Sequence, residues 1–581
     1  MQRARSMSAA DRPKRQIILS AFDMHTVSHQ APGMWTHPDD QSRCYTDLDY
    51  WTDLAQRLER GGFDCLFIAD VLGAYDVYEG SRDAAVRTAA QTPVNDPMMA
   101  ISAMAAVTER LCFGVTVSLT YELPYAFARK MSTLDHLTKG RIAWNIVTSY
   151  QQSAAVNLGL DRQIPHDERY DIADEFLEVC YKLWESSWED DAVIRDRSKG
   201  IFTDPSKVHD IDHQGKYYTV PGAHLSEPSP QRTPFLFQAG ASARGRMFAA
   251  QHAEAVFLTG TNPEDMRPVV DLLRMQIAEQ GRDPRQVKII MMLAPITGAD
   301  DSQAQKKLAE VLEHGSHDAA LALFGGWSGV DLAKTPRDLP IQKFQGDSVR
   351  AISDMLTRID SELEWTTERL ADWLCLGGMS AATVGSPSAI VDEMERWIEI
   401  ADVDGFNLAR VTTPGTMDDF IELVVPELRR RGHIPEIPLP AMTMRERFGG
   451  TRRLADGHPG SFHRFGFEGT RQAPPVTLES RPRKVGLYVT FEAKPGMQDE
   501  LIKWLRDSLA LVMDEPGTNT WYAFRLDDTT FGIFDTFDDE IGRHAHINGR
   551  VTESLGQITA KMLVAPPQVR QIDVLAAKYK A

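Results

Sequence analysis

The sequence predicts an α/β protein: a (β/α)8 TIM barrel with insertions, followed by a small α+β domain. Between residues 17 and 411, short apolar runs are each followed by a segment with helical spacing. The length of 581 residues exceeds one ordinary core, although a barrel with insertions can take up more than about 400 residues. Regular patterning returns after residue 485, which indicates a second domain.

Eight strands are expected in the barrel because eight runs are brief and apolar. They comprise residues 17–22, 63–69, 111–119, 141–147, 235–239, 255–258, 287–293 and 406–411. The helix after the fourth strand has the clearest helical pattern in the sequence, since Ala173, Phe176 and Cys180 share one helical face. Two gaps, 190–233 and 316–380, are too long for barrel loops and predict insertions.

The sequence after residue 431 predicts a linker and a second domain. Pro, Gly, Arg and His crowd together from residue 432 to 484, and periodicity is lost there. We place the barrel domain at 1–466, the linker at 467–484 and the second domain at 485–581. That domain shows strands at 485–491, 521–526 and 531–537 and helices at 497–513 and 538–555, the order of a ferredoxin-like α+β unit.

Composition excludes several classes of partner. With 63 Lys+Arg against 82 Asp+Glu, the net charge of −19 repels phosphate backbones and anionic membranes. The five cysteines show no C-x-x-C spacing, so we expect reduced thiols and no metal site. The basic leader has no apolar region and no run approaches 18 apolar residues, so we expect a cytoplasmic protein.

Polar side chains stand at or just past the ends of predicted strands two to five. They are Asp70, Thr116, Asn145 and Ser242. Barrel enzymes place binding and catalytic residues at these strand ends, so these are candidate site residues. A structural alternative stays open for Asp70 and Ser242, because Asp and Ser are also preferred helix N-caps.

Two further patterns indicate ligand contact. The run Gln238-Ala-Gly-Ala-Ser-Ala-Arg-Gly245 ends a strand and opens a helix, so free N–H groups and the helix dipole favour a terminal phosphate there. It is neither a dinucleotide fingerprint nor a P-loop. His166 and Tyr170 are four residues apart and share a helical face, although a polar helix entry explains them equally well.

These motifs together resemble the nitrilotriacetate and dibenzothiophene-sulfone monooxygenase branch of the bacterial luciferase-like flavin enzymes. The matching runs are Phe67-Ile-Ala-Asp70, Gly114-Val-Thr-Val-Ser118, residues 128–141, Trp144-Asn-Ile-Val-Thr-Ser149, His166-Asp-Glu-Arg-Tyr170 and Gln238-Ala-Gly-Ala-Ser242. The resemblance extends from about residue 17 to residue 463.

The resemblance implies a TIM barrel that binds FMN, reduced by a separate NAD(P)H-dependent flavin reductase, and that uses O2 as co-substrate. It implies that FMN is contacted by Asp70, Thr116, Asn145, His166, Tyr170 and Ser242, with Tyr170 and Ser242 near the phosphate and Asn145 near the ring. The absence of a dinucleotide fingerprint agrees with a separate reductase. We also expect a homo-oligomer.

The first loop departs from the pattern of these relatives. Ser28 stands where they carry Gly, and Thr36 stands where they carry Arg; Leu119 replaces a usual hydroxyl residue. His29 is the candidate catalytic residue, because an imidazole can donate or accept a proton near neutral pH. The insertion 316–380, with Phe324-Gly-Gly-Trp327, is expected to be either a lid or a packed excursion that supports dimerisation.

The C-terminal segment resembles the antibiotic-biosynthesis-monooxygenase family of dimeric α+β barrels. The matching runs are Ala493-Lys-Pro-Gly-Met497, Glu515-Pro-Gly-Thr518 and Ala545-His546. The resemblance implies either a second site formed by Trp521, His544 and His546, or a unit that dimerises through its sheet face or scavenges an intermediate.

The sequence therefore predicts a two-component FMN-dependent monooxygenase acting on a small organic substrate, often with C–S or C–N bond cleavage. The substrate classes left open are sulfones, aminopolycarboxylates and flavin-like molecules. Two alternatives also remain: a deazaflavin-dependent oxidoreductase, and a flavin-binding sensor or carrier without turnover.

Overall fold

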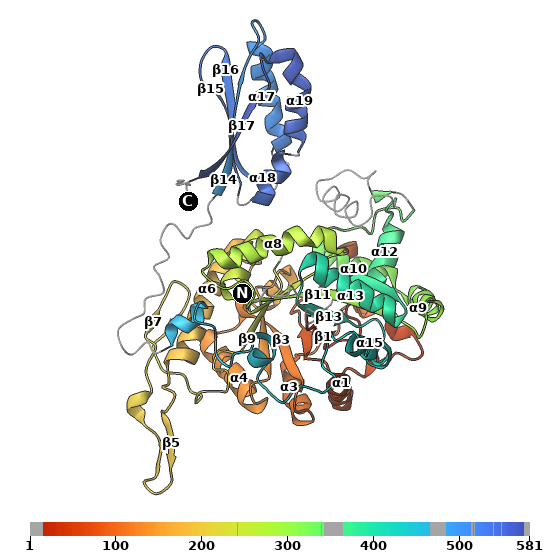
Figure 1. Ribbon diagram of the computed structural model, residues 1–581, viewed down its shortest axis with the longest axis vertical. Helices are drawn as coiled ribbons and strands as arrows, with labels where there is room; N and C mark the ends of the chain where they lie inside the picture. Colours follow the sequence, from red (N-terminus) through yellow and green to blue (C-terminus); the bar gives the residue numbers. More distant parts are fainter. Residues whose placement is uncertain are drawn as a thin grey trace, which may run out of the picture. The chain divides into compact units, whose positions relative to one another are not determined.

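The computed structural model describes residues 15–240, 242–338, 340–341, 364–464, 484–512, 515, 517–537, 540–547 and 549–574 (Figure 1). The chain separates into two compact units, Met1–Arg471 and Gln472–Ala581. The linker expected at 467–484 lies outside the described residues except for its last position, and so does most of the basic leader. Within the described residues, no helix is both long enough and apolar enough to cross a membrane.

Eight parallel strands form the closed barrel of the first unit. They are β1 (Ile18–Met24), β2 (Cys65–Ala69), β3 (Cys112–Ser118), β4 (Ile142–Val147), β9 (Phe235–Gln238), β10 (Ala255–Leu258), β11 (Lys288–Thr297) and β13 (Gly405–Ala409). Neighbours pair in the order β10-β9-β4-β3-β2-β1-β13-β11, and β10 pairs with β11 to close the ring. The eight predicted strands are confirmed, because parallel strands buried on both faces are continuous apolar runs.

Helices cover the outside of this barrel (Figure 1). The α-helices described in the first unit are α1 (Leu48–Gly61), α2 (Asp83–Thr88), α3 (Met98–Ala106), α4 (Pro124–Leu137), α5 (Gln152–Asn157), α6 (His166–Tyr181), α7 (Ala243–His252), α8 (Pro263–Glu279), α9 (Asp301–His314), α10 (His317–Ser328), α12 (Thr367–Cys375), α13 (Pro387–Ala401), α14 (Gly415–Asp419), α15 (Val425–Arg430) and α16 (Met444–Gly449). The helix expected after the fourth strand is α6, and its predicted face is buried.

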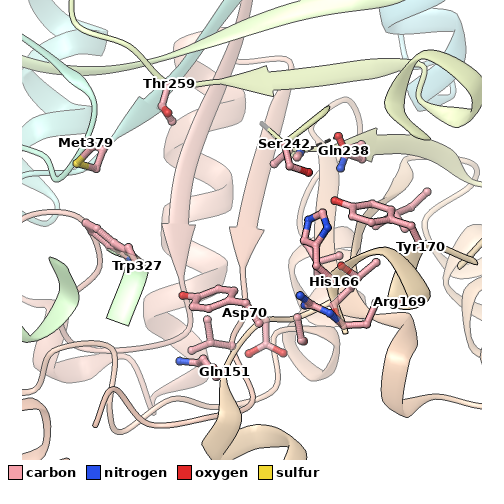
Figure 2. Close-up of a pocket in the computed structure, with 18 of the residues that line it drawn as sticks. Asp70, Gln151, His166, Arg169, Tyr170, Gln238, Ser242, Thr259, Trp327 and Met379 are labelled. Carbon is pink, nitrogen blue, oxygen red and sulfur yellow. Dashed lines mark hydrogen bonds between the residues drawn. The ribbon is translucent and has the colours of Figure 1, made fainter. Parts of the chain in front are cut away.

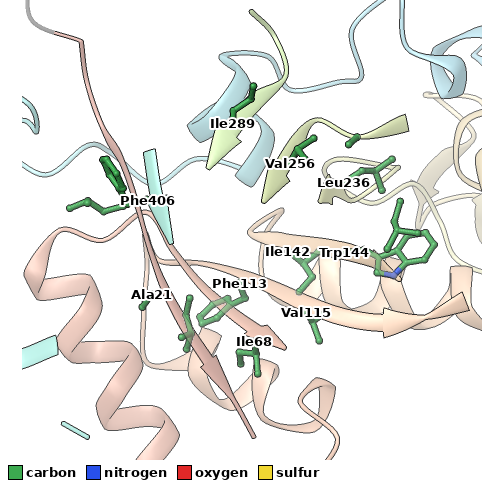
Figure 3. Close-up of a cluster of buried hydrophobic side chains, with 14 of the residues drawn as sticks. Ala21, Ile68, Phe113, Val115, Ile142, Trp144, Leu236, Val256, Ile289 and Phe406 are labelled. Carbon is green, nitrogen blue, oxygen red and sulfur yellow. The ribbon is translucent and has the colours of Figure 1, made fainter. Parts of the chain in front are cut away.

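The apolar core lies on both sides of the barrel wall. Inside the barrel, the ring of Phe257 lies 4.3 Å from that of Phe67 and 4.7 Å from that of Phe237. Outside, Trp144 and Phe113 belong to a larger cluster that packs the strands against the helices (Figure 3). Because side chains fill the interior, a ligand has to bind at the ends of the strands.

Both predicted insertions contain structure of their own. The first carries two hairpins, β5 (Val193–Asp196) with β6 (Ile201–Thr203) and β7 (His213–Gln214) with β8 (Thr219–Val220). The β5 hairpin projects away from the barrel (Figure 1).

The second insertion contains α10 and α12, and its residues 342–363 lie outside the described part of the chain. A ninth strand, β12 (Ala381–Gly385), follows it and pairs with β11 at the margin of the sheet. The sequence did not predict β12, because a half-buried Ala-Ala-Thr-Val-Gly run carries little strand signal.

The second unit is a four-stranded antiparallel sheet with helices. Its elements are β14 (Lys484–Glu492), α17 (Gln498–Val512), β15 (Thr518–Arg525), β16 (Thr530–Phe537), α18 (Glu540–Ile547), α19 (Arg550–Met562) and β17 (Gln568–Val574), with strand order β15-β16-β14-β17. The predicted β-α-β-β-α order is confirmed, and β17 completes it. The single helix expected at 538–555 is instead two helices, because Gly549 has an extended conformation between them.

Candidate active site

The candidate active site is a cavity of about 710 Å³ at the C-terminal ends of the barrel strands. Its volume suits a cofactor-sized ligand, since ligand pockets range from about 300 to 1,000 Å³. Asp70, His166, Tyr170 and Ser242 line it, so four candidate residues from distant parts of the sequence meet in one place (Figure 2). His29, Thr116 and Asn145 are not among the residues that line it.

The turn after β9 forms a narrow polar cradle at the start of α7. Ser242 is the N-cap of this helix, and its hydroxyl accepts a hydrogen bond from the N–H of Gly245 at 3.0 Å. A Cβ atom added to Gly240 would lie 2.9 Å from the Tyr170 hydroxyl, and one added to Gly245 would lie 2.7 Å from it. The two glycines therefore allow the Tyr170 hydroxyl to approach the backbone at the start of α7, where the positive end of the helix dipole lies.

Side chains of the first turn of α6 form the adjoining wall (Figure 2). Arg169 is buried, and its Nη1 donates to the carbonyl of Thr148 at 3.3 Å, whereas its Nε has no acceptor among the described residues. The His166 ring lies 5.2 Å from that of Tyr170. Burial raises the pKa of Tyr170, so its hydroxyl stays protonated and can donate to an anion. This wall can bind negative charge.

Asp70 lies at the end of β2 and lines the floor of the cavity in Figure 2. Burial, followed by the neighbouring charge of Asp96, raises its pKa to about 7, although the N–H of Val71 opposes this shift. The carboxyl group can therefore donate or accept a hydrogen bond near neutral pH. A carboxyl group that can both donate and accept suits contact with the polar edge of a ligand.

Thr116 and Asn145 lie in β3 and β4 and are buried. The Asn145 amide donates to the Thr116 hydroxyl at 3.0 Å, and its Oδ1 has no partner among the described residues. Their contact with FMN, which the family resemblance implied, stays a prediction. An unpaired buried carbonyl is a group that a ligand could satisfy.

His29 is buried in the first loop, while the next residue, Gln30, lines the cavity. The amide nitrogen of Gln30 lies 3.2 Å from Nε2 of His29. Burial, and then the charge of Arg410, lowers the pKa of His29 well below its ordinary value, so the ring is neutral. Gln30 thus lines the cavity and His29 does not, and the catalytic role of His29 stays a prediction.

The second insertion supplies the opposite wall of the cavity. Trp327, at the end of α10, and Met379 line it across from α6 (Figure 2). The insertion therefore contributes to the site, as a lid would. The alternative role in dimerisation stays a prediction.

Sequence reasoning missed several of the lining residues. Arg169 and Gln238 lie inside motifs already singled out, so their position next to Tyr170 and Ser242 was a usable signal. Thr259 directly follows the predicted strand 255–258, which is the same signal that marked Asp70. Gln30, Met292 and Met379 gave none, because a neutral side chain in a loop or within a strand has no sequence pattern that marks a cavity wall. Within the described part of the chain, no group of three or more His, Cys, Asp or Glu is arranged to hold a metal.

In the second unit, the three residues considered for another site do not share one environment. His546 is buried, with Nε2 3.0 Å from Asp535 and Nδ1 paired with Glu515. Burial alone would lower the pKa of His546, but the two carboxylates raise it to about 9. His544 is exposed and Trp521 is half-buried, so an ion-paired structural histidine accounts for His546.

Comparisons with known proteins identify the family. Residues 22–403 match the luciferase-like monooxygenase family. The dimethyl-sulfide monooxygenase of Hyphomicrobium sulfonivorans is 52% identical over 469 residues, which cover 80% of this chain and 98% of the relative. The long-chain alkane monooxygenase of Geobacillus thermodenitrificans is 51% identical over 446 residues, 76% of this chain and 97% of the relative.

Solved structures agree with this match. The crystal structure of DmoA from Hyphomicrobium sulfonivorans has a TM-score of 0.75 and covers 79% of this chain and 98% of its own. The structure of a riboflavin lyase with modified FMN and riboflavin has a TM-score of 0.70 at 36% identity, covering 78% of this chain and 100% of its own. The fold and the cavity define a TIM-barrel enzyme. The chain belongs to the luciferase-like monooxygenase family and is a flavin-dependent monooxygenase.

Proposed function

We propose that the cavity binds reduced FMN, supplied by a separate NAD(P)H-dependent flavin reductase, and that the enzyme uses it with O2 to oxygenate a small organic substrate. The observation that carries this proposal is the cradle at Ser242, where Tyr170, two glycines and the start of α7 converge. The solved riboflavin lyase that resembles this chain contains a modified FMN, which supports the choice of cofactor.

The residues of the cavity have distinct roles in this proposal. Ser242, Tyr170 and the N-terminal N–H groups of α7 would hold the phosphate, and Arg169 would add positive charge beside it. Asp70 would contact the polar edge of the ring system. Reduced FMN, when bound, supplies the electrons that allow one oxygen atom to enter the substrate while the other leaves as water.

The choice among substrate classes rests on the relatives. Those of 52% and 51% identity are named for dimethyl sulfide and long-chain alkanes, both neutral and apolar. A relative named for nitrilotriacetate, which is a polycarboxylate, is 32% identical. We therefore propose a neutral substrate for this enzyme, which argues against the aminopolycarboxylates among the classes that the motifs left open.

Four further features stay part of the proposal. They are the boundaries 1–466 and 485–581, an antibiotic-biosynthesis-monooxygenase-like second domain, a cytoplasmic location and a homo-oligomeric state. Each is supported by sequence pattern or by family resemblance.

The test is oxygen incorporation by the full-length protein. A flavin reductase and NADH would supply reduced FMN, and the product of a neutral sulfide formed under ¹⁸O2 would be analysed by mass spectrometry. We expect one ¹⁸O atom per oxygenated product and no product without FMN. Hydrogen peroxide as the sole product with every substrate, together with tight binding of a deazaflavin, would instead favour one of the alternatives.

A further inference from the structure

The two sides of the cavity differ in charge. The ionisable residues that approach it from the strand ends and α6 include Asp70, His166 and Arg169. The facing wall contains Gln30, Thr259, Met292, Trp327 and Met379, and none of these carries a charge. Figure 2 shows Trp327, Met379 and Thr259 across the cavity from His166, Arg169 and Tyr170.

Trp327 is held in place from two directions. Its Nε1 donates to the hydroxyl of Tyr75 at 3.3 Å, and that hydroxyl in turn donates to Gln91 at 2.9 Å. The preceding Gly326 lies directly against the Tyr75 ring, since an added Cβ would be 1.8 Å from it. A Cβ on Gly378 would lie 3.3 Å from the indole of Trp327. The indole is therefore a fixed part of the wall.

The support for this wall is a separate small core. Tyr75, Tyr78 and residues of α2 form an apolar cluster with α10 and α12, and Trp327 and Met379 pack against it. This cluster is distinct from the one that contains the barrel strands. The position of Trp327 is thus set by the insertion together with Tyr75 from the loop after β2. The Tyr75 hydroxyl also lies 3.1 Å from the hydroxyl of Tyr150, which lines the cavity.

We propose that Trp327 sets the size of the substrate, and that the wall it forms with Met292 and Met379 selects a small, neutral, apolar molecule. This inference rests on the proposed function. A carboxylate placed against this wall would lose its hydration without gaining a cationic partner there, which is costly. The large indole occupies space that a longer substrate would need, whereas methionines adapt their shape to an apolar ligand.

The experiment compares Trp327→Ala and Trp327→Phe with wild type in the full-length enzyme with reduced FMN. The probes are dimethyl sulfide, dibutyl sulfide and 3-(methylthio)propionate, which is a sulfide with a carboxylate. Trp373→Ala is the matched control, because Trp373 belongs to α12, packs against the same cluster and does not line the cavity.

We expect Trp327→Ala to shift the ratio of kcat/KM for dibutyl sulfide over dimethyl sulfide upward by about 10-fold or more, because a few methylenes in a pocket are worth that much discrimination. Trp327→Phe should give a smaller shift in the same direction, and it also serves if the alanine variant does not fold. Trp373→Ala should leave the ratio unchanged. In all variants the carboxylated sulfide should be the poorest substrate.

The inference is overturned if the ratio is unchanged in both Trp327 variants, if Trp373→Ala shifts it equally, or if wild type prefers the carboxylated sulfide. Calorimetric binding of the same sulfides to the FMN complex separates this failure from failure of the proposed function. If wild type binds dimethyl sulfide selectively and Trp327→Ala reverses that preference, but no product forms, the inference stands and the monooxygenase assignment fails.

Discussion

The two walls of the barrel cavity differ in origin, charge and support. The polar wall comes from strand ends and from the first turns of α6 and α7, which every (β/α)8 barrel presents at its C-terminal face. On the apolar wall, Trp327 and Met379 come from an insertion that packs with α2 in a separate small core, whereas Gln30, Thr259 and Met292 come from the first loop and the barrel strands. We therefore propose that the polar wall binds the cofactor and that the wall containing Trp327 selects the substrate.

If the two walls have separate roles, a substitution in one wall should affect one property of the enzyme and not the other. A change on the polar wall should alter flavin affinity and leave substrate preference alone, and a change on the apolar wall should do the opposite. Because the supporting clusters are separate, the two effects should also be additive.

The largest effect is expected from Ser242→Glu, which places a carboxylate where the phosphate of FMN would bind. Loss of charge-assisted hydrogen bonds and new repulsion should weaken FMN binding by about 100-fold or more. Isothermal titration with FMN measures this. Ser242→Ala is the control, because it removes the helix cap, worth about 1 kcal/mol of stability, without adding charge. Unchanged affinity in the Glu variant rejects the phosphate site.

A smaller effect, on the other wall, is expected from Gly326→Ala. The new methyl group would meet the Tyr75 ring at 1.8 Å, so α10 has to shift at a cost of about 1–3 kcal/mol. We expect a lower Tm of the insertion and a raised KM for dimethyl sulfide, with FMN affinity within about twofold of wild type. Gly222→Ala is the control, since nothing lies within 4 Å of its added Cβ. Loss of FMN binding in Gly326→Ala would show that the walls are one unit.

A smaller effect is expected in the pH dependence of stability, which depends on Asp70 in the polar wall. Burial raises the pKa of Asp70 to about 7, so the folded apoprotein favours the protonated form. The stability that protonation contributes is complete below the ordinary pKa of 3.8 and is lost as pH rises through 7. Asp70→Asn should therefore have a Tm that exceeds wild type increasingly from pH 5 to pH 8. A difference that does not vary with pH would contradict the assigned environment of Asp70.

The smallest effect is expected from removal of the second unit by a stop after residue 471. The residues that line the cavity all belong to the first compact unit. The truncated protein should bind FMN within about twofold of the full chain and keep the same sulfide preference. Both are measured by the assays above. A large loss of either property would show that the second unit takes part in the site.

Residues of the polar wall could be predicted from the sequence more readily than residues of the apolar wall, for a physical reason. Strand ends are visible in a sequence because parallel strands are apolar runs, and so Asp70 and Ser242 could be placed at the site. Tyr170 followed from its spacing to His166 on a helix. Neutral wall residues such as Met379 have no such pattern, since their position depends on how a long insertion folds back.

The same reasoning explains the first loop. The sequence points to His29 because histidine titrates near neutral pH, yet its ring is buried, and burial and then the charge of Arg410 lower its pKa. Its neighbour Gln30 lines the cavity instead. A shift of one residue along a loop is decided by tertiary contacts, which local sequence does not encode.

The most direct test of the division between the walls is the ratio of the Kd for riboflavin to the Kd for FMN, measured in wild type, Ser242→Glu and Trp327→Ala. If the polar wall binds the phosphate on its own, the ratio is large in wild type and in Trp327→Ala and falls close to one in Ser242→Glu. A ratio near one in wild type, or its loss in Trp327→Ala, contradicts the account.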